Sequence, residues 1–391
     1  MIESDSWRMA IDLAVHQVIA DGDPAPDVVM LFANPAYADS FPELVREARD
    51  RTGAGTLIGC VAEAVLANGE EVDRRPGLSI IALWLPGAMI HPVRLHQEQV
   101  CLFDEPELWR EATGSPVEGV NAWLVIAEPF RIDVQSVLKG LTALYPGSSI
   151  MGGIASGTQP DRQACVFFDD QVYDEGGVAL AIGGPYRIVP FVSQGCEPVG
   201  ETWTVTAADR NTIRTISNRP ALDVLRSSVA TLPEHAWEGA HSNLVVGFAG
   251  DEYRDAFHRG DFIVRGLLGI DPDEGTITVG GMPRVGQTIQ FHVRDARTAD
   301  VDLHQMLVEA RALAATGSPV AGLLCTCVGR GVKLFGTPNH DPAAVQAAFG
   351  DLPVVGVHCR GEIGPLGNET VLHGFTATFG LLMHDANARK S

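Results

Sequence analysis

The chain has 391 residues, of which 46% are hydrophobic and 20% are charged. This balance is typical of globular domains and differs from that of disordered chains, and the length predicts two or three domains. Lys and Arg together number 28 and Asp and Glu number 49, which gives a formal net charge of −21 at pH 7. A surface this acidic repels phosphate backbones and anionic headgroups, so we expect neither nucleic-acid binding nor membrane insertion.

The start of the chain and its cysteines indicate a cytoplasmic protein. The first six residues are polar and acidic, and the first apolar segment carries Asp12 and His16, so no signal peptide is predicted. The longest apolar runs, 78–85 and 178–182, have the length of strands and fall short of the roughly 20 residues of a membrane-spanning helix. The seven cysteines are an odd number spread thinly along the chain, which favours reduced thiols over a disulfide framework.

Two similar strand and helix patterns occupy the first half of the chain. Residues 27–33 predict a buried strand, 41–51 a helix, 55–60 a second strand and 78–85 a third. The same order returns as a strand at 122–127, a helix at 134–144, and strands at 149–153, 164–168 and 177–182. The two patterns align with a nearly constant offset, which indicates an internal duplication over about 25–115 and 120–205.

The second half of the chain is expected to hold a related domain. Residues 207–225 look helical, and a boundary is predicted within 231–242, which divides the chain into domains at 1–230 and 231–391. Further strands are predicted at 244–247, 262–267, 276–279, 320–328, 353–358 and 372–382, with helices at 302–315 and 342–349. The sequence therefore predicts an α/β or α+β fold, in which duplicated strand, helix, strand modules form N-terminal lobes and a related mixed α/β domain follows.

Several common catalytic and nucleotide-binding motifs are absent from the sequence. None of the three lysines, Lys139, Lys333 and Lys390, follows a glycine, which excludes a phosphate-binding P-loop. The chain also contains no G-x-G-x-x-G after a strand, no G-x-S-x-G, no H-E-x-x-H and no C-x-x-C. The usual nucleotide, hydrolase and zinc sites therefore lack support.

Candidate site residues gather in the C-terminal third, around glycines that let the backbone approach a ligand closely. Arg330 and Arg360 suit the binding of a carboxylate by two hydrogen bonds, and Glu362 and His373 suit proton transfer. Each has a structural alternative: Cys325 and Cys327 as small buried side chains, Glu362 as an acceptor for loop amides, His373 as a core histidine, and Arg330 as an ion-pair partner of Glu362. A metal site built from Cys325, Cys327, His358 and Cys359 is not expected, because neighbouring strand residues face opposite sides.

At these residues the sequence resembles the FIST proteins, named for F-box and intracellular signal transduction proteins, over nearly the whole chain. The segments that carry the resemblance are 151–153, 194–200, 203–206, 259–265, 291–296, 327–331, 361–365 and 373–376. The resemblance implies a FIST N-terminal domain and a FIST C-terminal domain that together form a sensor of small ligands, with an amino acid or related metabolite as the ligand. It also implies a downstream signalling protein as partner, because the module fills the chain from about residue 25 to 385.

Three functions stay open at this point. The first is a small-ligand sensor, with the site in a cleft of glycine-rich strand-end loops. The second is a haem-binding sensor of nitric oxide, which the resemblance to some relatives implies, although no cofactor is otherwise predicted. The third is an enzyme with Cys327 as nucleophile, or with Glu362 and His373 as an acid/base pair. The predicted ligand-binding residues are Gly152, Gly153, Gln194, Cys327, Gly329, Arg330, Gly331, Arg360, Glu362, His373 and Thr376.

Overall fold

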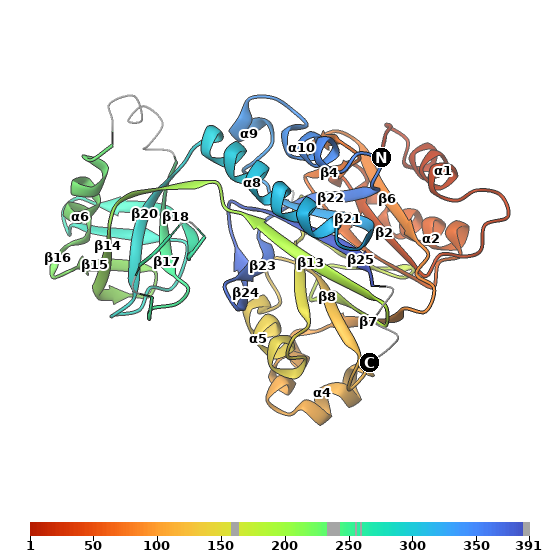
Figure 1. Ribbon diagram of the computed structural model, residues 1–391, viewed down its shortest axis with the longest axis horizontal. Coiled ribbons are helices and arrows are strands. Elements are labelled where there is room, and N and C mark those ends of the chain that lie inside the picture. The colour runs from red at the N-terminus through yellow and green to blue at the C-terminus, as the bar shows by residue number, and fades with distance from the viewer. Residues whose placement is uncertain (158–163, 233–242, 255, 259, 386–391) are drawn as a thin grey trace.

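The computed structural model describes residues 1–157, 164–232, 243–254, 256–258 and 260–385. Among these residues, three six-stranded sheets with flanking helices form one body, and the described part of 196–294 forms a barrel beside it (Figure 1). Strands and helices alternate along the chain and the strands form mixed sheets, so the predicted α/β class is confirmed. Within the described residues, no helix is long and apolar enough to cross a membrane.

The body consists of three repeats of one pattern: a strand, a helix, a second strand parallel to the first, a hairpin, and a third strand antiparallel to the first. The first repeat comprises β2 (Val28–Ala33), α2 (Phe41–Thr52), β3 (Thr56–Val61), β4 (Ala64–Ala67), β5 (Glu70–Asp73) and β6 (Gly77–Leu83). The second comprises β8 (Val120–Ala127), α5 (Val134–Leu144), β9 (Ser149–Ile154), β10 (Val166–Phe168), β11 (Gln171–Tyr173) and β12 (Gly177–Gly183). The third comprises β21 (Ser318–Cys327), α9 (Val332–Phe335), α10 (His340–Phe349), β22 (Val354–Cys359), β23 (Glu362–Leu366), β24 (Glu369–His373) and β25 (Ala377–His384).

Each repeat is preceded by an edge strand that completes its sheet. These edge strands are β1 (Ile2–Glu3), β7 (Met89–Leu95) and β13 (Tyr186–Ser193), which pair with β6, β12 and β25. The remaining helices of the body are α1 (Trp7–Val18), η1 (Pro35–Ser40), α3 (Gln97–Val100), η2 (Cys101–Asp104), α4 (Pro106–Thr113) and α8 (Ala296–Ala314). Asp295 caps α8 by accepting hydrogen bonds from the amides of Arg297 and Thr298.

Each repeat contributes its hairpin to the sheet of another repeat, so that the three repeats form a closed ring. The hairpin β4–β5 of the first repeat pairs with β22 of the third, β10–β11 of the second pairs with β3 of the first, and β23–β24 of the third pairs with β9 of the second. Each sheet therefore contains strands from two repeats, and no repeat completes its own sheet.

One glycine in the second strand of each repeat explains how closely the paired parallel strands pack. A Cβ on Gly59, Gly152 or Gly356 would overlap the carbonyl oxygen of the facing residue in the first strand, which is Leu31, Val125 or Leu324 respectively. The three glycines thus mark equivalent positions, and the strand registers extend this equivalence to the residues around them.

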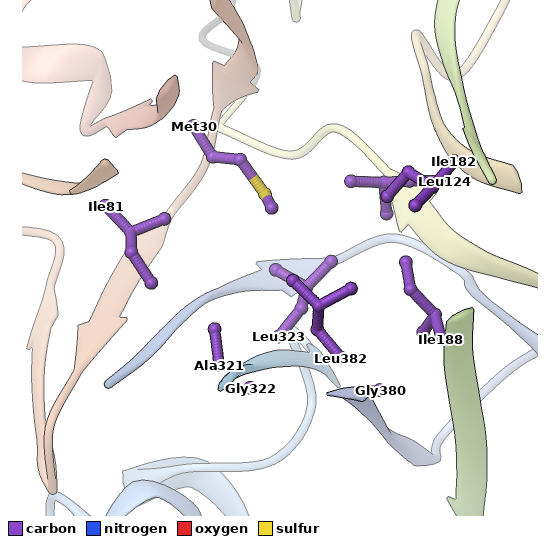
Figure 2. A pocket seen from close by; sticks show the side chains of 10 residues that line it. All are labelled: Met30, Ile81, Leu124, Ile182, Ile188, Ala321, Gly322, Leu323, Gly380 and Leu382. Atoms are coloured by element: carbon purple, nitrogen blue, oxygen red, sulfur yellow. The ribbon is translucent and has the colours of Figure 1, made fainter. Parts of the chain in front are cut away.

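The three repeats meet in an apolar core. Figure 2 shows Met30 and Ile81 of the first repeat, Leu124 and Ile182 of the second, and Leu323 and Leu382 of the third pointing toward one another. They line a cavity of about 20 Å³, which is large enough for little more than one water molecule. A second cavity of about 10 Å³ lies near Cys60, Cys325 and Cys359. The centre of the body is therefore closely packed and offers no room for an organic ligand.

In its described residues, the barrel has six antiparallel strands, and β14 pairs with both β20 and β15 and so closes the sheet on itself. Its elements are β14 (Cys196–Asp209), β15 (Thr212–Ile216), the appended β16 (Arg219–Pro220), α6 (Ala221–Val229), β17 (Leu244–Ala249), β18 (Phe262–Asp271), β19 (Thr276–Val279) and β20 (Thr288–Arg294). Side chains of α6 such as Leu222 and Val224 pack with the strand residues Ile213 and Phe291 in one core.

The helix expected over residues 207–225 is wrong for most of that range. The segment forms the end of β14, then β15 and β16, and only from Ala221 does it form α6. Four of the five residues of β15 are threonine or isoleucine, and these β-branched side chains favour strands. Arg210 turns the chain between β14 and β15 with φ of 50°.

The barrel is an insertion in the third repeat, between its edge strand β13 and α8 (Figure 1). The chain enters through Cys196 and leaves through Arg294, and these two residues are register partners in neighbouring strands. We call this connection the neck. The domain boundary expected at 231–242 falls largely on residues 233–242, which lie outside the described residues.

Candidate functional site

Polar side chains from the body and the barrel meet at the neck. They come from the end of β13, from β18 and β20, from the end of β21 and the loop after it, and from the β23–β24 hairpin and its connection to β25. We call this group the junction cluster, and its members are Gln194, Arg265, Arg294, Cys327, Arg330, Glu362, His373 and Thr376.

Glu362 is the buried acid of the junction cluster, with 0% of its surface exposed. Its Oε2 accepts hydrogen bonds from the Thr376 amide at 3.0 Å and from the Thr376 hydroxyl at 2.7 Å. Its Oε1 is also buried and has no hydrogen-bond partner among the described residues. Burial raises the pKa of Glu362 to about 8, because it disfavours the charged form, so the group is mostly protonated at neutral pH.

The repeats themselves show that the fold does not require this acid. The register gives Glu362 the same place as Val166 in the second repeat and Val65 in the first, because their partners Gly153, Cys60 and Val357 are equivalent. Thr376 stands where the other repeats carry Gly176, just before β12, and Gly77, the first residue of β6. An acid and the hydroxyl that binds it have therefore replaced a valine and a glycine in the third repeat alone.

Arg330 is held by a buried carboxylate, although not by the one considered from the sequence. Its Nε lies 2.6 Å and its Nη2 3.0 Å from the two carboxylate oxygens of Asp341, in the first turn of α10. Arg330 is 1% exposed and Asp341 is 2% exposed. Burial disfavours the charged carboxylate, but the Arg330 guanidinium nevertheless holds the pKa of Asp341 below its usual range. The ion-pair partner of Arg330 is thus Asp341, whereas the sequence suggested Glu362.

Arg265 and Arg294 bring positive charge from the barrel without a carboxylate partner. Arg265 donates from Nη1 to the Val264 carbonyl at 2.9 Å and from Nη2 to the Leu372 carbonyl at 2.8 Å. Arg294 donates to the Gly329 carbonyl at 3.1 Å, and its guanidinium lies 4.5 Å from the ring centre of Phe375. In the described part of the chain, neither arginine has an ion pair. With Glu362 protonated and Arg330 balanced by Asp341, the junction cluster carries two uncompensated positive charges.

His373 lies opposite Glu362 in the β23–β24 hairpin. Its Nε2 is 3.1 Å from the Pro365 carbonyl, while its buried Nδ1 has no hydrogen-bond partner among the residues described. Burial lowers the pKa of His373 to about 4, so the imidazole is neutral at pH 7.

Cys327 is also uncharged. Burial raises the pKa of its thiol to about 11, with the Glu362 carboxyl adding to the effect, and the sulfur accepts a hydrogen bond from the Gly329 amide at 3.4 Å. A thiol held protonated in this way is a weak nucleophile, so these contacts do not favour catalysis by Cys327.

The other predicted ligand-binding residues lie in three places. Gln194 is in the junction cluster and donates to the Phe262 carbonyl of the barrel at 2.6 Å. Gly329 and Gly331 flank Arg330, and Gly331 has a φ of 58°, which favours glycine. Gly152 and Gly153 line the 10 Å³ cavity in the centre of the body. Arg360 lies elsewhere, with its guanidinium 5.8 Å from the ring centre of Phe130.

Sequence reasoning did not select Arg265, Arg294 or Asp341. The two arginines lie in segments that carry the resemblance, but they sit on barrel strands whose proximity to β23 depends on tertiary structure. Asp341 is the second residue of α10, where an acidic side chain has the ordinary interpretation of a helix N-terminal residue. In the ranges that the structure describes, no three His, Cys, Asp or Glu side chains are arranged to hold a metal ion.

Comparison with models of protein families identifies two adjoining domains of one family. A model of the FIST N domain matches residues 27–219, and a model of the FIST C domain matches residues 221–365. An uncharacterized protein of Mycobacterium tuberculosis is 33% identical over 392 residues, and one of Mycobacterium bovis is 32% identical over 388 residues. Each alignment covers 97% of this chain and 97% of the relative.

A crystal structure of a cyanuric acid hydrolase from A. caulinodans aligns over 98% of this chain and 96% of its own, with 10% identity and a TM-score of 0.31. This similarity is too low to carry an argument about fold or function. The two family models together span the body and the barrel, and the relatives match along almost the whole chain. The chain therefore belongs to the FIST family, whose domains are generally sensors in signal transduction.

Proposed function

We propose that this FIST protein is a cytoplasmic sensor that binds a small carboxylate ligand, an amino acid or a related metabolite, at the junction cluster. The observation that carries the proposal is the pair of arginines, Arg265 and Arg294, that face the buried Glu362 without a carboxylate of their own. Guanidinium groups bind carboxylates through short, charge-assisted hydrogen bonds, which suits a ligand that brings the missing negative charge.

The internal comparison supports a binding role for Glu362. A buried acid costs stability unless its hydrogen bonds are complete, and the Oε1 of Glu362 lacks a partner among the described residues. Valine fills the same place in the other two repeats, so the packing of the sheet does not call for an acid. An ammonium or amide group of a ligand could donate to this oxygen while the ligand carboxylate lies at the arginines.

The position of the junction cluster suggests how binding is passed on. Gln194, Arg265 and Arg294 belong to the neck and the barrel, whereas Arg330 and Glu362 belong to the body. A ligand that contacts both sides would favour one orientation of the barrel relative to the body, as in hinge closure around a ligand. We propose that a downstream signalling protein reads this orientation.

Isothermal titration calorimetry of the full chain with the twenty L-amino acids tests the proposal. The matched amines and deaminated acids are measured in parallel, because they separate recognition of the carboxylate from recognition of the amino group. A charge-assisted hydrogen bond contributes about 1.5–3 kcal/mol, so Arg294→Gln is expected to weaken binding at least about tenfold.

Arg131→Gln provides the control. Arg131 follows β8 at the place equivalent to Arg330, but its partner is the exposed Asp174 at 3.2 Å, and its replacement should leave binding unchanged. If Arg265→Gln and Arg294→Gln both bind the same amino acid as tightly as the unaltered chain, the ligand does not lie at the junction cluster. If none of the amino acids binds, the proposed ligand class is wrong.

A further inference from the structure

Two buried hydroxyl groups flank Ala377 on one face of the third sheet. Ser193 of β13 and Thr326 of β21 are both register partners of Ala377 in β25, so the three side chains lie in one row on the same face. This face is covered by α8, because Ala377, Phe379 and Leu381 share a core with Leu303 and Met306. Ser193 and Thr326 are 0% exposed, and neither hydroxyl has a hydrogen-bond partner among the residues described.

Arg330 adds a third unsatisfied donor at the same end of the sheet. Asp341 engages its Nε and Nη2, while its Nη1 is buried and, in the described ranges, makes no hydrogen bond. This Nη1 would lie 3.3 Å from a Cβ on Gly195, two residues after Ser193. The small Ala299 of α8 lies beside the same glycine.

The other repeats show that the fold does not require these hydroxyls. Ser193 stands where the second repeat carries Leu95 and the first carries Ile2. Thr326 stands where they carry Ala127 and Ala33. Two hydroxyls thus stand in place of apolar side chains in one row of the third sheet, at the end where the Arg330 Nη1 has no hydrogen-bond partner among the described residues.

We propose that Ser193, Thr326 and Arg330 bind a small monatomic anion of the size of chloride. Three buried donors without an acceptor are strongly unfavourable, so the site calls for an acceptor. A water molecule accepts two hydrogen bonds, so it would have to donate to one of the hydroxyl oxygens, whereas an anion accepts hydrogen bonds from all three donors at once.

This anion site is distinct from the ligand site proposed above. The amino-acid site is built on Glu362 and the barrel arginines, whereas the anion site lies on the α8 side of the third sheet, and only Arg330 belongs to both groups. A bound anion would stabilise the loop after β21 and so hold Arg330 in place. The two proposals can therefore fail separately.

Crystals of the full chain grown in sodium bromide test the anion site. Data collected at the bromine absorption edge are expected to show an anomalous peak within hydrogen-bond distance of the Ser193 and Thr326 hydroxyls and of the Arg330 Nη1. Thermal melts in sodium chloride and in sodium methanesulfonate, whose larger anion carries no carboxylate, at equal ionic strength and without any amino acid, are expected to show a higher melting temperature in chloride.

Thr326→Val and Ser193→Ala each remove one hydroxyl and should abolish both the bromide peak and the chloride effect on melting. Thr378→Val is the matched control. Thr378 is also a buried threonine of the third sheet without a hydrogen-bond partner among the described residues, but its register partner Cys325 lines the central cavity, so it faces the other side.

The proposal is overturned if ordered water, with no anomalous signal, occupies the site in bromide. It is equally overturned if chloride raises the melting temperature of Thr326→Val as much as that of the unaltered chain. A chloride effect that is lost in Thr326→Val and kept in Thr378→Val supports the proposal, whatever the outcome of the amino-acid titrations.

Discussion

The functional interpretation of Glu362 and Thr376 depends on the positions that they occupy in the third repeat. From the sequence alone, a glutamate among glycines has two interpretations. It either accepts hydrogen bonds from loop amides or contacts a ligand, and the sequence does not decide between them. The structure supplies an internal comparison, because valine and glycine fill the same two places in the other repeats. Thr376 donates two hydrogen bonds to one carboxylate oxygen of Glu362 and leaves the other for a further donor.

The stability of the protein should depend on pH through Glu362. Its pKa is about 8 in the folded chain against a usual value of 4.5, so the folded state binds more protons between these values and stability falls as pH rises through this range. His373 has its pKa lowered from 6.5 to about 4, so it contributes a rise in stability with pH that is complete by about pH 6.5. The contribution of Glu362 is therefore best separated between pH 6.5 and 8.

Urea unfolding of the Glu362→Gln variant and the unaltered chain measures this contribution. The free energy of unfolding of the unaltered chain should fall more steeply from pH 6.5 to 8, by at most about 1.4 kcal/mol for each pH unit relative to the variant. Parallel profiles for the two proteins would show that Glu362 does not keep a proton in the folded state.

At the scale of elements, the paired parallel strands of each repeat pack so closely that a glycine is needed between them. Gly59, Gly152 and Gly356 lie directly against a neighbouring backbone carbonyl, which cannot move aside as a flexible side chain can. The pattern of strand, helix and glycine could be predicted from the sequence, because continuous apolar runs and glycines are local features. The reason for each glycine could not be predicted, because the carbonyl that it faces belongs to an adjacent strand and is brought there by the tertiary structure.

Gly356→Ala should destabilise the protein by about 3 kcal/mol or more, since the added methyl group must push two paired strands apart. Urea unfolding of this variant and of the unaltered chain measures the loss in the free energy of unfolding. Gly269→Ala is the control, because Gly269 lies in β18 and a Cβ there would have no neighbour within 4 Å, so its effect should be small. Equal stability of the two variants would contradict the packing described for the parallel strands.

The hairpins and the barrel mark the limit of what the sequence could predict. Residues 68–76 look like a polar connection, yet they include β5, because the hairpin β4–β5 pairs with a strand of the third repeat. The run 372–382 looks like one strand, yet it divides into β24 and β25 around Phe375, whose φ is 67°. In the junction cluster, the residues of the third repeat could be selected from glycine pattern and family resemblance, whereas the arginines of the barrel could not.

At the scale of the whole molecule, the FIST N domain and the FIST C domain do not coincide with the body and the barrel. The family boundary near residue 220 divides the barrel, because β14 to β16 lie before it and β17 to β20 after it. The chain passes from the body into the barrel at Cys196 and returns at Arg294, and these two residues are neighbours in adjacent strands. An insertion whose ends lie side by side is well suited to folding as a separate unit.

Removal of residues 196–294, with a short Gly-Ser linker in their place, should leave a body that folds. Circular dichroism and a cooperative thermal transition would show this. By contrast, chains of residues 1–220 and 221–391 should each fail to fold when expressed alone, because the cut divides both the barrel and the ring of exchanged hairpins. A folded 1–220 chain together with an unfolded barrel deletion would contradict this division of the molecule.

The exchange of hairpins also determines when parts of the chain can fold during synthesis on the ribosome. The hairpin β4–β5 is synthesised early, but its neighbour β22 lies far along the chain: the Val354 amide donates to the Asn68 side chain across a separation of 286 residues. Until β22 emerges, the apolar side of this hairpin has no sheet to join. We therefore expect a late, slow folding step and a nascent chain that depends on chaperones, because contacts so distant in sequence form last.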